Sequence, residues 1–121
     1  MNKGVVTEAL FDFIATEKGM VVSRPLADIG YDRIVDCNGK LTRVQIKTSS
    51  YKQNGSYIAK TSGRENRRYI DEFDILAIHI RPIDIWVILP FSAITSSAMR
   101  IYVDTKSAKY VNNWKLFYAE N

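Results

Sequence analysis

The sequence has few of the features that support an oxidising compartment or a membrane. A single cysteine, Cys37, rules out an internal disulfide, so we expect a reducing compartment and a cytoplasmic protein. The longest apolar stretch, residues 83–91, has the length of a strand and contains Asp84, whereas a membrane span needs roughly 20 apolar residues. No continuous apolar segment follows Lys3, and we therefore expect neither a signal peptide nor a membrane partner.

Several common catalytic motifs are also missing. The chain has no glycine-rich phosphate loop, no Ser/His/Asp arrangement and no zinc-ligand spacing, so we expect no nucleotide cofactor and no acyl-transfer chemistry. The only histidine, His79, lies inside the apolar run 74–80. We expect it to be a hydrogen-bonded core residue and not a catalytic one.

What is present fits a single α/β domain spanning residues 1–121. The composition is that of a soluble globular protein, with 46% hydrophobic and 25% charged residues. In the first segment Val6, Leu10, Phe13 and Ile14 follow helical spacing and predict the face that packs on the sheet. The predicted order is a helix over 3–18, strands over 20–23, 31–37, 40–48, 57–60, 74–80, 85–89 and 99–103, and a helical or irregular tail over 108–118.

The positive charge is concentrated in one part of the chain. The net charge of +4 divides into −2 over residues 1–37, +7 over 38–68 and −1 over 69–121. Such a local excess of positive charge is typical of a surface that binds a polyanion, although a solvated loop would have the same composition.

A β-hairpin is predicted around Asn38-Gly39, the strongest short-range hairpin signal in the sequence. A two-residue turn pairs Cys37 with Lys40, which places Asp32 opposite Gln45 and diagonal to Lys47. Because side chains alternate along strands, these three side chains would share one face. A carboxylate and an amide oxygen are hard donors that suit Mg²⁺, and a nearby amine can assist phosphodiester hydrolysis. The alternative is that they simply form the polar face of a half-exposed hairpin.

The order of these residues resembles the PD-(D/E)XK nuclease superfamily: Glu8 on a helix, Asp32 on a strand, then Gln45-x-Lys47 on the next strand. The segments KGVVTEAL, YDRIVDCNGKLTRVQIKT and YIDEFDILAIHI resemble its intron-encoded homing endonucleases, with glutamine in place of the second acidic residue. The resemblance implies a restriction-endonuclease-like core, with a mixed central sheet and an N-terminal helix packed on it. It also implies a metal site formed by Asp32, Gln45 and Glu8 that takes Mg²⁺ or Mn²⁺, with Lys47 serving the attacking water and the phosphate.

The same resemblance implies a Mg²⁺-dependent endonuclease that cuts double-stranded DNA. Because a site on one small domain cuts one strand, we expect a homodimer or a dimer of dimers. A Holliday-junction-resolving nuclease and a catalytically inactive DNA-binding module stay open as alternatives. The side chains expected to contact DNA lie in or near the basic segment: Arg43, Thr48, Ser49, Lys52, Lys60, Arg64, Arg67 and Arg68.

Overall fold

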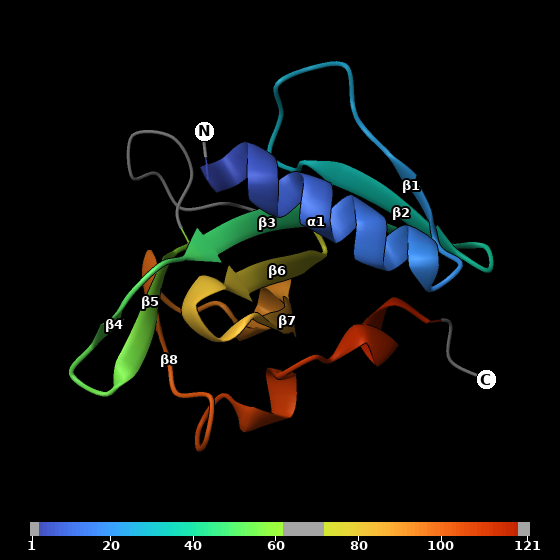
Figure 1. The fold of residues 1–121 in the computed structure, drawn as a ribbon. Helices are drawn as coiled ribbons and strands as arrows, with labels where there is room; N and C mark the ends of the chain where they lie inside the picture. Colours follow the sequence, from blue (N-terminus) through green and yellow to red (C-terminus); the bar gives the residue numbers. More distant parts are fainter. Residues whose placement is uncertain (1–2, 62–71, 119–121) are drawn as a thin grey trace.

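The computed structural model describes residues 3–61 and 72–118 and has a five-stranded mixed sheet at its centre, with one helix lying across it (Figure 1). The strand order is β1-β2-β3-β6-β7, in which β3 and β6 are parallel and the other neighbours antiparallel. The elements are α1 (Lys3–Glu17), β1 (Val21–Ser23), β2 (Arg33–Cys37), β3 (Lys40–Ser49), β6 (Ile75–Ile80) and β7 (Ile85–Pro90). This arrangement confirms the predicted α/β class and the packing of the N-terminal helix on a mixed sheet.

The β2–β3 hairpin forms in the predicted register. Asn38 and Gly39 both have positive φ, 52° and 91°, as a type I′ turn requires. The Gly39 N–H donates to Oδ1 of Asp36 at 2.9 Å, which stabilises the turn. Cys37 pairs with Lys40 and Arg33 with Val44, so the hairpin places Asp32 where the sequence predicted it.

A second, three-stranded sheet lies beyond the end of β3 in the order β4-β5-β8 (Figure 1). Its strands are β4 (Lys52–Gln53), β5 (Ser56–Lys60) and β8 (Ala98–Ile101). The sequence analysis missed β4, although Asn54-Gly55 repeats the Asn-Gly signal and has positive φ at both residues. The short 3-10 helix η3 (Phe91–Ala93) follows β7, and the tail contains η4 (Ala108–Tyr110) and η5 (Trp114–Phe117).

The core has two layers, one on each face of the central sheet. On the α1 face, Phe11 stacks with Trp114 of η5 and meets Trp86 of β7 edge-on, with ring centroids 5.8 and 5.7 Å apart. On the other face, β6 and β7 pack against the second sheet through residues such as Leu76 and Ile101. Every residue of β6 is therefore buried, as its near-continuous apolar sequence predicted. His79 of β6 is buried and shares a 2.8 Å hydrogen bond with Asp84, as the sequence predicted.

The face of α1 that packs on the sheet differs from the predicted one. Thr7, Phe11 and Ala15 form the buried stripe, whereas Phe13 is 62% exposed. The helix is apolar over most of its circumference, so its own pattern does not select one face. As a result Glu8 lies next to the buried stripe, beside the sheet, and not on the far side of the helix. Within the described residues, no helix is long and apolar enough to cross a membrane.

Candidate active site

Asp32 is attached to β3 by two hydrogen bonds. Its backbone N–H donates to the Val44 carbonyl at 2.8 Å, and its Oδ2 accepts the N–H of Ile46 at 2.8 Å. Regular pairing of β2 with β3 starts only at Arg33. The N–H of Ile46 therefore has no backbone carbonyl of β2 opposite it and donates to the Asp32 carboxylate instead. One carboxylate oxygen is thereby fixed at the edge of the sheet.

Gln45 and Lys47 lie on β3 on the same face of the hairpin as Asp32. Gln45 is only 7% exposed, and its side-chain amide makes no hydrogen bond to any described residue. Lys47 is half-buried and its charge interacts with that of Asp32. The structure thus brings together the carboxylate, the amide and the amine that the hairpin register predicted.

Burial shifts the pKa of both ionisable members of this cluster towards the neutral form. It raises the pKa of Asp32 above its ordinary value, against the opposing effects of the Ile46 hydrogen bond and the Lys47 charge. It lowers the pKa of Lys47, with Asp32 opposing this shift and the nearby positive charge of Lys60 adding to it. A carboxyl and an amine perturbed in opposite directions at one site are typical of a functional centre.

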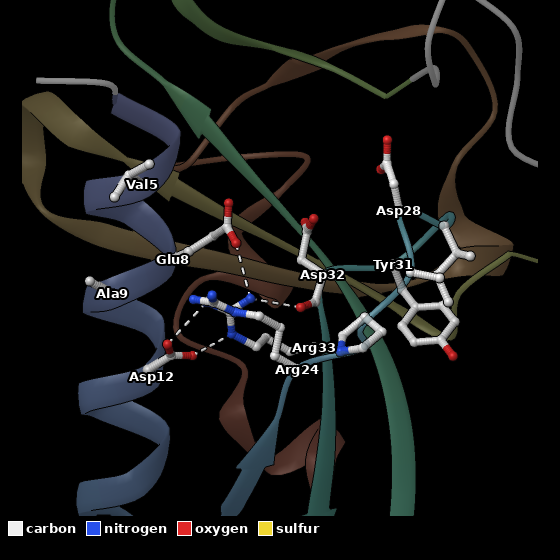
Figure 2. Close-up of a pocket in the computed structure, with 12 residues that line it drawn as sticks. Val5, Glu8, Ala9, Asp12, Arg24, Asp28, Tyr31, Asp32 and Arg33 are labelled. Carbon is white, nitrogen blue, oxygen red and sulfur yellow. Dashed lines mark hydrogen bonds and ion pairs between the residues drawn. The ribbon is translucent and has the colours of Figure 1, made fainter.

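Glu8 reaches this region from α1 through Arg33, which the sequence analysis did not identify. Oε1 of Glu8 accepts from Nη1 of Arg33 at 3.0 Å, and the same nitrogen donates to the Asp32 carbonyl at 2.7 Å. The other side of the guanidinium pairs with Asp12, at 2.7 Å from Nε and 3.1 Å from Nη2. Figure 2 shows Arg33 between the carboxylate of Glu8 and the backbone carbonyl of Asp32.

Glu8, Asp32 and Arg33 line a pocket of about 420 Å³ between α1 and the loop that precedes β2 (Figure 2), whereas Gln45 and Lys47 are not among its lining residues. The loop contributes Arg24 and Asp28, two residues that the sequence analysis did not single out. The negative charge of Asp28 adds to the rise in the Asp32 pKa. No sequence motif includes Arg24 or Asp28, so the sequence could not have identified them as site residues. Only the folded loop places them beside the hairpin.

The comparisons with known proteins agree with this geometry. The family model described as PD-(D/E)XK endonuclease matches residues 2–117. The chain belongs to the PD-(D/E)XK endonuclease family. Among solved structures, it is similar to the bacterial homing endonuclease I-Ssp6803I, with a TM-score of 0.77 and 24% identity over 94% of this chain and 87% of that one. No curated protein matches the chain.

The donor set of this PD-(D/E)XK family member fits a hard divalent cation. No group of three His, Cys, Asp or Glu side chains that could hold a metal occurs among the described residues. The available oxygen donors are instead two carboxylates, Asp32 and Glu8, and the amide of Gln45. Carboxylate and amide oxygens are hard donors of the kind that Mg²⁺ prefers, so the chemistry of this donor set suits that ion.

The six basic residues expected to contact DNA fall into three groups. Lys52 and Lys60 are exposed on the second sheet, and Lys60 is close enough to affect Lys47. Arg43 pairs with Asp74 at 2.9 Å on the surface. Arg64, Arg67 and Arg68 lie outside the described residues.

The two hydroxyl residues in this set are engaged within the protein. Thr48 shares a 2.6 Å hydrogen bond with Thr7 of α1. Ser49 is buried and donates to the Ile58 carbonyl at 2.8 Å. Contact with a phosphate would break a bond that joins β3 to a neighbouring element, so the structure lends no support to the expected DNA contacts of Thr48 and Ser49.

Proposed function

We propose that the protein is a metal-dependent endonuclease that hydrolyses phosphodiester bonds of double-stranded DNA at specific sites, as a homing endonuclease does. The observation that carries the proposal is the cluster of Asp32, Gln45 and Lys47 at one edge of the sheet, with Glu8 beside it. The family supports a nuclease, and the fold shared with a bacterial homing endonuclease supports the homing role.

Each residue of the cluster has a role that its environment supports. Asp32, Gln45 and Glu8 would hold Mg²⁺ or Mn²⁺, which would supply positive charge to stabilise the phosphate and acidify water. Asp32 presents its carboxylate in a fixed position because Ile46 binds Oδ2. Lys47, whose pKa is lowered by burial, would donate a hydrogen bond to a phosphate oxygen when charged. When neutral, its Nζ would accept a proton from the attacking water.

The basic residues define the proposed path of the DNA. Lys52 and Lys60 extend from the cluster along the second sheet, and Arg64, Arg67 and Arg68 follow Lys60 directly in the sequence. Such contacts would go mainly to the phosphate backbone, so binding would weaken steeply with salt.

We further propose that the active unit contains two or more copies of the chain. If residues 1–121 form one domain with one active site, a monomer cuts one strand, and cutting both strands needs a homodimer or a dimer of dimers. Sedimentation of the protein with and without a cleavable duplex measures this directly, and a monomer that cuts both strands would contradict the proposal.

The test is a cleavage assay in Mg²⁺ and in Mn²⁺ at low salt, with pooled plasmid DNA and a synthetic four-way junction as substrates. We expect Lys47→Ala to cut plasmid DNA roughly 100- to 10,000-fold more slowly than wild type. Lys109→Ala, which changes an exposed lysine of η4 that packs against β7 at the opposite edge of the sheet, is the matched control and should cut normally.

Three outcomes would overturn parts of the proposal. Equal cutting by wild type and Lys47→Ala would remove the role of Lys47 and point to a contaminating nuclease. Cutting confined to the junction would make the protein a junction-resolving enzyme. Tight binding to DNA sites selected from a random pool, without cutting of those sites, would make it a DNA-binding module.

A further inference from the structure

Arg33 is a buried charge at a position where strand alternation favours an apolar residue. It lies on the α1 face of β2, together with the core residues Val35 and Cys37, and its side chain is 3% exposed. Burying a guanidinium costs several kcal/mol unless partners compensate, and a buried ion pair is weak evidence of a gain in stability. A gain in stability therefore does not explain why Arg33 is buried among carboxylates.

The guanidinium connects three separate acidic residues with its three nitrogens. Nε and Nη2 bind the two oxygens of Asp12, while Nη1 binds Oε1 of Glu8 and the backbone carbonyl of Asp32. This paired geometry with Asp12 fixes the plane of the guanidinium. The two N–H groups of Nη1 then point in fixed directions, one to the Glu8 carboxylate and the other to the Asp32 carbonyl.

The charges explain why two carboxylates face one arginine. Asp12 makes the shorter, bidentate contact, and it is the main reason why the pKa of Arg33 is raised. Asp12 thereby balances the charge of Arg33, and Glu8 contacts the guanidinium through one oxygen only. Without Asp12, Glu8 would be the only carboxylate left to neutralise Arg33.

We propose that Arg33, held in place by Asp12, is the positioning residue that sets Glu8 and Asp32 at the spacing needed to bind a divalent cation. The inference rests on the proposed nuclease function and extends it to two residues outside the proposed metal ligands. Outer residues that orient metal ligands typically change metal affinity 10- to 100-fold when they are altered.

The experiment measures Mn²⁺ binding by electron paramagnetic resonance of the free ion, with the full chain and no DNA, so that activity is not the readout. We expect Asp12→Asn to raise the Mn²⁺ concentration for half-saturation about tenfold, and Asp12→Glu to restore most of the affinity. Arg33→Lys should weaken binding as Asp12→Asn does, because a single ammonium has three N–H donors and cannot reproduce the four contacts that the planar guanidinium makes. Asp74→Asn makes the same change in another bidentate Arg–Asp pair, at the surface, and should bind Mn²⁺ like wild type.

Thermal unfolding in EDTA accompanies each variant, so that binding is compared only between folded proteins. Wild-type affinity in folded Asp12→Asn would reduce Asp12 and Arg33 to a structural pair and overturn the inference. The proposed function would survive that result if Asp32→Asn still abolished Mn²⁺ binding. Absence of Mn²⁺ binding by wild type would overturn both, because there would be no cation for these residues to position.

Discussion

Replacing Asp32 by asparagine should make the metal-free protein more stable while it removes nuclease activity. Burial raises the pKa of Asp32 despite the Ile46 hydrogen bond and the charges of Lys47 and Arg33, so the carboxylate form is disfavoured in the folded state. Asparagine keeps an oxygen that can accept the Ile46 N–H and removes the buried charge. Relief of strain or charge at a functional site commonly stabilises a protein by about 1 kcal/mol, which corresponds to a rise of about 4 °C in Tm for a chain of this size.

The pH dependence gives this prediction its sign. The folded-state pKa of Asp32 lies above the unfolded value of 3.8, so wild type carries the full free-energy penalty only at pH above the folded pKa. The penalty disappears as the pH falls below 3.8, where Asp32 is protonated in both states. The gain in Tm of Asp32→Asn should therefore be largest near neutral pH and vanish at about pH 3.

The assay is thermal unfolding followed by circular dichroism in EDTA at both pH values. Asp36→Asn makes the same chemical change two residues along the same hairpin, at a side chain that also accepts a backbone N–H, and should shift the free energy of unfolding by less than about 0.5 kcal/mol. A lower Tm for Asp32→Asn than for wild type at neutral pH would refute the reasoning. It would mean that the Ile46 and Lys47 interactions stabilise the carboxylate by more than burial disfavours it.

Three further predictions concern the fold around the site. The surface contacts with Arg43 lower the pKa of Asp74, so they add stability above the unfolded pKa that is lost as the pH falls through the folded value. Asp74 is 44% exposed, so Asp74→Asn should cost only about 0.5 kcal/mol at neutral pH in urea titrations, and a loss that persists at pH 2 would contradict this cause. Phe11→Ala removes a fully buried ring between Trp86 and Trp114 and should cost about 3–5 kcal/mol; a cost below 1 kcal/mol in the same titrations would show that α1 is not held by this contact. A Cβ at Gly30 would overlap the side chain of Glu72, so Gly30→Ala should displace the loop that carries Asp28 and reduce DNA cleavage. Gly19→Ala meets no atom within 4 Å but is strained by the φ of +87° at this residue, so it should lower stability by about 1 kcal/mol and leave cleavage by the folded protein unchanged. Equal cleavage by these two glycine variants would show that the loop position does not matter.

The part of the site that lies within the hairpin could be predicted from the sequence because short-range chemistry determines it. Two residues with positive φ, Asn38 and Gly39, set the turn type, and the turn type sets every cross-strand pair back to Arg33 and Val44. Alternation of side chains then assigns Gln45 and Lys47 to one face. No contact outside residues 31–48 is needed to place these side chains on one face.

The remainder of the site depends on packing that is not encoded locally. The helix pattern predicted only part of the buried face, because Leu10 and Ile14 pack against the core whereas Phe13 is exposed. A helix that is apolar over most of its surface can pack in several rotations, and only the sheet selects the one that buries Thr7 and Phe11. That rotation brings Glu8 and Asp12 to Arg33, more than 20 residues further along the chain. Asp28 likewise reaches the pocket only because the loop folds against the hairpin.

By itself, then, the sequence determined the hairpin, its register and the identity of the residues at its polar edge, since these follow from backbone preferences of adjacent residues. Only the tertiary structure decided which carboxylates surround Asp32, which arginine orients them and how deeply each is buried. Desolvation and ion pairing depend on atoms that meet across the whole chain, so no local pattern records them.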